Sequence, residues 1–224
     1  MPLKPRVVSL QVGRVRTLGT PGATDRLERP WKSAYIKPPV LVPLRLSRTR
    51  FEGDEQYDVD SHGGPEMAAL AYCDEHYALW RDELDLAEMG PGGFGENLTI
   101  SGLDEDSVAV GDVYAIGSAR VQVSQPRGPC FNISKRWRRA ELLDRVVATG
   151  RTGWYFRVLD EGQVTAGDPV VRLQRPLPEW TVARTLRLGL DPSPDPASCL
   201  ELANCDLLSP GWREKFRRRS GTAG

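Results

Sequence analysis

The stretch that decides the fold is SVAVGDVYAIGSARVQVSQPRGPCFNISKR, residues 107–136. Its first part alternates apolar and polar residues, and the pairs Gly-Asp and Gly-Ser interrupt that alternation. Such a pattern predicts short antiparallel strands joined by tight turns. The strand pattern ends at Cys130, which stands between Arg-Gly-Pro and Phe-Asn. The sequence therefore predicts a β architecture that leads directly to a single cysteine.

Further strands are predicted on both sides of this stretch. They lie in VVSLQVGRVRTL (7–18), in WKSAYIKPPV and VLVPLRLSRTRFEGD (31–54), and in GWYFRVLDEGQVTAGDPVVRL (153–173). The second group contains prolines, which a sheet accepts at its edges or at bulges. This favours a barrel or an irregular meander over a flat central sheet.

Helices are predicted between and after the strands. Residues 65–84, PEMAALAYCDEHYALWRDEL, have helical spacing behind an initial proline, and residues 133–150 have the pattern of a shorter helix that ends at a glycine. Beyond residue 176 three short apolar-periodic segments follow Asp, Pro and Ser start signals. We expect an α+β fold, mainly β with helices. It consists of a β-barrel-like domain over residues 1–175 and a three-helix domain with a basic tail over residues 176–224.

Composition restricts the classes of partner. Of the 224 residues 40% are hydrophobic, and 30 basic side chains balance 30 acidic ones. A balanced charge does not favour nucleic acid as a partner. The sequence has neither an apolar run of membrane-spanning length nor a start typical of a secretory signal. We therefore expect a cytoplasmic protein that binds no nucleic acid and no membrane.

Four cysteines, at positions 73, 130, 199 and 205, have the spacing of neither a disulfide framework nor a zinc site. Cys73, Cys199 and Cys205 lie in apolar patterns of helical type, where a buried small side chain is the ordinary interpretation. Cys130 differs because Gln125, Arg127 and other polar residues surround it in a proline-stiffened segment. We therefore predict a functional role for Cys130.

Three other stretches are rich in residues that chemistry uses. Lys37 stands in YIKPPV, His62 precedes Gly63 and Gly64 at a predicted helix start, and Asn97 stands in the glycine-rich GPGGFGENLT. Glycine turns let backbone amides approach an anion. GPGGFGENLT is not a dinucleotide fingerprint, because its glycines precede the strand instead of following it. Ordinary alternatives are a surface lysine, a helix cap and a turn in which Asn97 bonds its own backbone.

Two chemistries are open for Cys130. A cationic neighbourhood favours the thiolate, which attacks electrophiles or binds a soft metal. Cys130 is then either a nucleophile with His62 as its base, or the one protein ligand of a metal whose other ligands come from a cofactor. A lone thiolate suits the second chemistry, because no cluster of Cys, His or carboxylates at ligand spacing accompanies it.

The motifs IKPPV, DVDSHGGPEMA, FGENLTISGL, SQPRGPCFNISKR and TGRTGWYFRVLDEGQVTAGD occur here in the order typical of one family. Together they resemble the YiiM-like MOSC-domain proteins, related to the C-terminal domain of molybdenum cofactor sulfurase. The last helices resemble the three-helix domain of that family. The resemblance implies a β-barrel-like MOSC domain that binds the molybdenum cofactor (molybdopterin) and reduces N-hydroxylated compounds such as hydroxylaminopurines and amidoximes.

The resemblance also implies roles for single residues. Cys130 is the expected molybdenum ligand, and Cys130, His62 and Asn132 are the expected catalytic residues. The expected cofactor-binding residues are Lys37, His62, Gly63, Gly64, Asn97, Gln125, Arg127 and Asn132. Since the sequence has no CxxC-type spacing and no flavin or nicotinamide fingerprint, we expect a separate electron-donating reductase. The C-terminal helices are the expected docking surface for it.

Two other functions stay open at this point. In the first, the protein is a sulfur carrier or handles a cofactor through a persulfide on Cys130. In the second, it is a binding module without catalysis.

Overall fold

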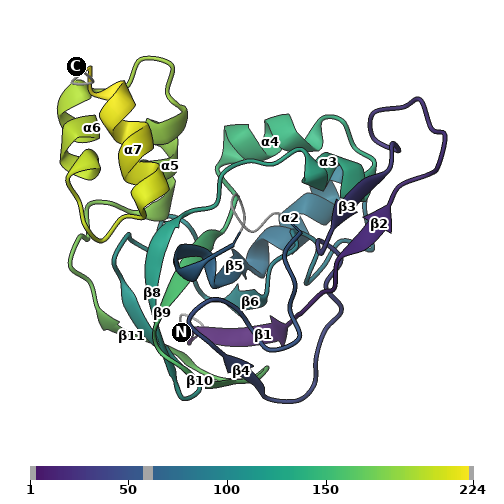
Figure 1. Cartoon of the computed structure of the whole chain (residues 1–224), viewed down its shortest axis with the longest axis horizontal. Helices are drawn as coiled ribbons and strands as arrows, with labels where there is room; N and C mark the ends of the chain where they lie inside the picture. Colours follow the sequence, from purple (N-terminus) through teal and green to yellow (C-terminus); the bar gives the residue numbers. More distant parts are fainter. Residues whose placement is uncertain (1–3, 58–62, 222–224) are drawn as a thin grey trace.

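A computed structural model describes residues 4–57 and 63–221. Its largest element is a curled seven-stranded sheet in the order β1-β6-β5-β9-β8-β7-β11 (Figure 1). All neighbouring strands are antiparallel except β5 and β6, which are parallel. The strands are β1 (Arg6–Leu10), β5 (Ala69–Cys73), β6 (Leu98–Ser101), β7 (Val113–Ile116), β8 (Ala119–Pro126), β9 (Trp154–Asp160) and β11 (Val170–Gln174).

The outer ends of this sheet meet. Val7 N–H donates to the carbonyl of Asp168 (2.9 Å), and Val170 N–H donates to the carbonyl of Pro5 (2.9 Å). These bonds join β1 to the start of β11, so the sheet curls into the expected barrel-like shape. Two small antiparallel sheets complete the β structure: β2 (Arg16–Leu18) with β3 (Trp31–Ser33), and β4 (Leu44–Leu46) with β10 (Gly162–Val164).

The apolar core has three parts. One fills the inside of the curled sheet and contains Tyr114, Trp154 and Phe156. A second lies under α2 (Glu75–Leu84), α3 (Asn132–Trp137) and α4 (Leu142–Thr149). The third lies among α5 (Val182–Leu190), α6 (Pro196–Ala203) and α7 (Pro210–Arg219), which Figure 1 shows as a separate group of helices.

The three C-terminal helices begin at side-chain caps. The side chains of Thr181, Asp195 and Ser209 each accept a hydrogen bond from a backbone N–H of the first helical turn. Such caps satisfy N–H groups that have no partner inside the helix. The three helices predicted from start signals in the sequence are thus confirmed, and so is the α+β fold. Within the described ranges, no helix combines the length and the apolar character needed to cross a bilayer.

Two helix predictions were wrong in extent. The helix predicted over 65–84 is a short 3₁₀ turn, η1 (Pro65–Met67), followed by the strand β5 and then by α2. Every residue of β5 is buried between β6 and β9, so tertiary pairing overrides the helical preference of its alanines. The helix predicted over 133–150 is divided into α3 and α4, because Arg138 adopts a left-handed conformation (φ 51°).

Candidate functional site

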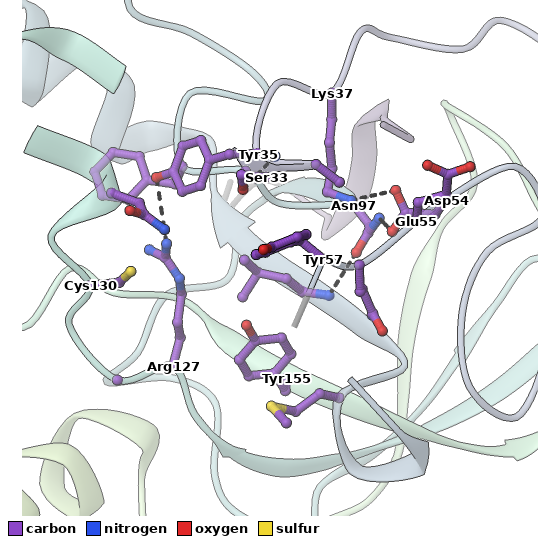
Figure 2. A pocket seen from close by; sticks show the side chains of 18 of the residues that line it. Ser33, Tyr35, Lys37, Asp54, Glu55, Tyr57, Asn97, Arg127, Cys130 and Tyr155 are labelled. Atoms are coloured by element: carbon purple, nitrogen blue, oxygen red, sulfur yellow. Dashed lines mark hydrogen bonds and ion pairs between the residues drawn. The ribbon is translucent and has the colours of Figure 1, made fainter. Parts of the chain in front are cut away.

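A cavity of about 970 Å³ lies between the sheet, the segment after β8 and the segments that carry Tyr35 and Asp54. The structure brings six of the predicted residues to its wall: Lys37, Asn97, Gln125, Arg127, Cys130 and Asn132. Figure 2 shows Cys130 and Arg127 at one end of this cavity, and Asp54 and Glu55 at the other. A cavity of this size accepts a ligand as large as a cofactor.

Three predicted residues are not placed at the wall. His62 lies outside the described residues. Gly63 and Gly64 are not among the residues that line the cavity. The helix expected to start there is only the short 3₁₀ turn η1.

Cys130 lies in the loop between β8 and α3. Its side chain is half-buried and lines the cavity, whereas Cys73 and Cys199 are buried. Cys73 lies on the strand β5 and Cys205 lies just beyond α6, so the helical placement of these two residues was wrong. In the same loop, a Cβ added to Gly128 would meet nothing within 4 Å, which leaves the backbone beside Cys130 open to the cavity.

Arg127 is a buried cation at the same end of the cavity. Its side chain is 6% exposed, and its Nη2 lies 3.5 Å from the Tyr35 hydroxyl. Its backbone N–H donates to the carbonyl of Gly153 (3.0 Å), which holds this segment against the chain before β9. No carboxylate of the described chain forms an ion pair with Arg127. A guanidinium stays charged and is costly to bury without an anion, so Arg127 is a candidate anion-binding residue.

Two tyrosines accompany Arg127. Burial raises the pKa of Tyr35 and of Tyr155, although the nearby Arg127 opposes this in both. Both phenols are therefore protonated at neutral pH and can donate a hydrogen bond into the cavity, which both residues line.

Lys37 has a different environment from Arg127. Its ammonium forms a buried ion pair with Asp54, and their side chains are 8% and 1% exposed. Burial lowers the pKa of Lys37, while the attraction of Asp54 raises it. The charge of Lys37 is thus balanced within the protein, and Arg127 is the buried cation that lacks such a partner among the described carboxylates.

Asn97 connects three segments of the chain at the cavity wall. Its Oδ1 accepts from Leu70 N–H (3.1 Å), and its Nδ2 donates to Asp54 Oδ2 (2.9 Å) and to the carbonyl of Gln11 (3.2 Å). The ordinary alternative, a turn in which Asn97 bonds its own backbone, was therefore wrong. Asn97 positions Asp54 and, through it, Lys37.

Glu96 organises the glycine-rich loop before β6. Its buried carboxylate accepts hydrogen bonds from Gly92 N–H (2.7 Å), Phe94 N–H (3.1 Å), the Tyr77 hydroxyl (2.6 Å) and Thr99 Oγ1 (2.7 Å). Gly92 has φ 86°, and a Cβ there would lie 2.8 Å from the carbonyl of Lys37. The loop thus packs closely against the segment that carries Lys37.

Tyr35, Asp54, Tyr155 and Trp212 are among the wall residues that the sequence prediction missed. Tyr35 is two residues before Lys37 in the same motif, YIKPPV, so the motif could have indicated it. Asp54 and Tyr155 stand in runs that otherwise have strand character, and Trp212 stands in the C-terminal helices. Nothing in their local sequence relates them to Cys130, since only the tertiary fold brings them together.

Comparisons with known proteins match both parts of the chain. Residues 58–171 match the family described as MOSC domain. Residues 180–219 match the family described as YiiM-like, 3-alpha helix domain.

Individual relatives extend these matches. The chain is 37% identical to the uncharacterized protein YflK of Bacillus subtilis (strain 168), over 95% of this chain and 93% of that protein. It is 36% identical to a protein named Reductase from Gibberella moniliformis, over 83% of this chain but only 34% of that protein. The crystal structure of YiiM from Geobacillus stearothermophilus superposes with a TM-score of 0.80 at 31% identity and covers 97% of this chain and 100% of that one.

Proposed function

The chain belongs to the MOSC-domain family, in its YiiM-like form with a three-helix domain, and on this premise we propose that it is a molybdenum-cofactor-dependent reductase of N-hydroxylated compounds. In this proposal Cys130 is the metal ligand. The fungal relative named Reductase supports an oxidoreductase function, although the chain spans about a third of that protein.

The observation that carries the proposal is the pairing of a thiol with a buried cation. Cys130 and Arg127 line one cavity, and Arg127 has no carboxylate partner in residues 4–57 and 63–221. A thiolate suits a soft metal, and a guanidinium suits the phosphate of a pterin cofactor. The described residues contain no group of three or more His, Cys, Asp or Glu placed for a metal ion. A single protein ligand therefore fits a metal whose other ligands belong to a cofactor.

The polar wall also fits such a cofactor. Gln125 and Asn132 line the cavity on either side of Arg127 and Cys130 in the chain, and their amides can donate to and accept from the edge of a pterin. The open backbone at Gly128 leaves room for a bulky group beside the thiol. We assign His62 to the same site as a proposal, on the strength of its motif alone.

When bound, the molybdenum cofactor supplies the two-electron chemistry that converts an N–OH group to N–H. The overall reaction consumes two electrons and two protons and releases one water molecule. Arg127 balances anionic charge beside Cys130. The hydroxyls of Tyr35 and Tyr155 keep their protons at neutral pH and orient polar groups of the ligand by hydrogen bonds.

The electrons come from a separate reductase in this proposal. The sequence has no spacing typical of an iron–sulfur cluster and no flavin or nicotinamide fingerprint. We propose that the partner docks on the C-terminal helices, where α7 ends in Arg217, Arg218 and Arg219.

The test compares the wild type with Cys130→Ser and Cys205→Ser, all purified from a host that makes the cofactor. Cys205 is a matched control because it is also half-buried but does not line the cavity. We expect near-stoichiometric molybdenum and pterin in the wild type and in Cys205→Ser, and loss of molybdenum in Cys130→Ser. Reduction of benzamidoxime with a chemical reductant is expected to follow molybdenum content.

Other results would contradict the proposal. A folded wild type without molybdenum, or a Cys130→Ser variant that keeps it, excludes Cys130 as the metal ligand of a reductase. A persulfide on Cys130 in a molybdenum-free wild type, detected by mass spectrometry, would indicate the sulfur carrier instead.

A further inference from the structure

The three-helix group contributes a residue to the cavity that Cys130 lines. This residue is Trp212, in the first turn of α7. The cavity wall is therefore built from both parts of the chain that the two family descriptions cover. Besides the proposed docking of a reductase, these helices can therefore also contact a ligand in the cavity.

The backbone fixes Trp212 relative to the strand that leads to Cys130. Ser209, the N-cap of α7, donates its backbone N–H to the carbonyl of Ser124 on β8 (3.0 Å). The hydroxyl oxygen of Ser209 accepts from Trp212 N–H (3.4 Å). Ser124 directly precedes Gln125, which lines the cavity. One strand thus anchors the helix start that carries Trp212 and also leads into the loop that carries Cys130.

Side-chain packing fixes the Trp212 indole as well. A Cβ added to Gly189 on α5 would lie 2.7 Å from Cζ3 of Trp212, so α5 packs directly against the ring. The Lys215 ammonium lies 4.5 Å from the ring centroid, and the centroid of Phe216 lies 5.8 Å away. A ring held in this way loses little side-chain entropy when a ligand contacts it.

The cavity wall combines two kinds of surface. The polar and charged part consists of Arg127, Cys130 and the side-chain amides of Gln125 and Asn132. Trp212 belongs to a set of apolar or aromatic lining residues with Met67 and Tyr155. Aromatic faces and a methionine thioether both make favourable contacts with a flat aromatic group.

We propose that Trp212 is a specificity-determining residue that favours N-hydroxylated compounds with a planar aromatic body over small aliphatic ones. The inference rests on the proposed function, because it assumes that the N–OH group is directed toward Cys130. The aromatic body then lies against Trp212, at the part of the wall that the three-helix group supplies.

The experiment uses benzamidoxime and acetamidoxime, which share the amidoxime group and differ in the aromatic ring. Binding to the molybdenum-loaded protein is measured by isothermal titration calorimetry without reductant, so that neither compound turns over. Trp212→Leu is expected to weaken benzamidoxime binding by about 5- to 150-fold, the range that loss of one aromatic stacking partner produces. Acetamidoxime binding is expected to change less than about threefold, and Trp212→Phe is expected to retain most of the preference.

Trp180→Phe is the matched control, because Trp180 is a buried indole in the apolar core among α5, α6 and α7 that does not line the cavity. It is expected to bind both compounds like the wild type. Equal weakening of both compounds by Trp212→Leu, no weakening of either, or no measurable benzamidoxime binding by the wild type would overturn the inference. Molybdenum content and turnover are measured separately, so a failure of the proposed reductase function is distinguishable from a failure at Trp212.

Discussion

Lys37 and Asp54 form a buried ion pair in the cavity wall, and Asn97 Nδ2 donates a hydrogen bond to Asp54 (2.9 Å) (Figure 2). Asp54 also accepts a hydrogen bond from Gly13 N–H (2.8 Å). Asp54 was not predicted from the sequence, yet it determines where the predicted Lys37 lies. The pair and these hydrogen bonds thus join four segments of the chain, at residues 13, 37, 54 and 97.

Asp54→Asn is expected to lower the free energy of unfolding by about 3–5 kcal/mol at neutral pH, because it leaves the Lys37 ammonium buried without its partner. Urea denaturation measures this change. Glu52→Gln is the control, because Glu52 is exposed nearby in the chain, and it is expected to change stability by less than about 0.5 kcal/mol. An Asp54→Asn variant as stable as the wild type would mean that the ion pair contributes nothing to folding.

The same variant has an expected pH dependence. Burial lowers the pKa of Lys37 from its ordinary value of 10.5, and removal of Asp54 removes the attraction that opposes this. Below the ordinary value the unfolded chain then binds more protons than the folded one, so stability rises with pH. The stability deficit of Asp54→Asn is therefore expected to shrink between about pH 7 and pH 9.5, and a deficit that grows over this window would contradict the assignment.

Glu96→Gln is expected to destabilise the protein by about 3 kcal/mol, because an amide NH₂ at either oxygen position then faces a backbone N–H, of Gly92 or of Phe94, that can only donate. The thermal midpoint and urea denaturation measure the effect. Glu88→Gln is a suitable control, since Glu88 is exposed near the same loop. Unchanged stability in Glu96→Gln would show that the carboxylate does not hold the glycine-rich loop.

Thiol alkylation is expected to divide the four cysteines into two classes. Cys130 and Cys205 are half-buried, whereas Cys73 and Cys199 are 2% and 0% exposed, and burial raises the pKa of both. Iodoacetamide is expected to modify Cys130 and Cys205 at least about tenfold faster than the other two, as read by peptide mass spectrometry. A bound cofactor is expected to protect Cys130 alone. Protection of Cys205 to the same extent would contradict ligation at Cys130.

The proposed reductase docking predicts an effect of surface charge on α7. Arg217 and Arg218 are exposed and lie beyond Trp212 in the same helix. Arg217→Glu with Arg218→Glu is expected to lower turnover with the physiological reductase by about tenfold or more, since charge reversal weakens association with an acidic partner. Turnover with a chemical reductant is expected to stay unchanged. If the double variant turns over as fast as the wild type with the physiological reductase, the docking surface lies elsewhere.

Local patterns predicted most of the strands, because alternation and turn pairs report which residues face the core. They also predicted the three C-terminal helices, since Thr181, Asp195 and Ser209 are strong caps. They failed for β5, where ALAYC has the composition of a helix but pairs with strands on both sides. Local preference cannot register those neighbours, which come from far along the chain.

The sequence predicted those residues of the candidate site that belong to short, recognisable motifs. Lys37, Asn97, Arg127 and Cys130 belong to short unusual segments and do meet at one cavity. Glu96 stood beside Asn97 in a quoted motif, but its role as acceptor for four donors depends on the folded loop. Asp54 and Trp212 depend on contacts between segments far apart in sequence, so no motif could indicate them.

The position of Trp212 has a consequence for the order in which the cavity forms during protein synthesis. A ribosome delivers β8 and Cys130 long before α7, so the emerging chain holds the thiol and Arg127 while one wall is still missing. Ser209, which bonds Ser124, is made only just before α7. A nascent chain therefore lacks the part of the cavity wall that Trp212 supplies, and α7 is the last of the described elements to add to that wall.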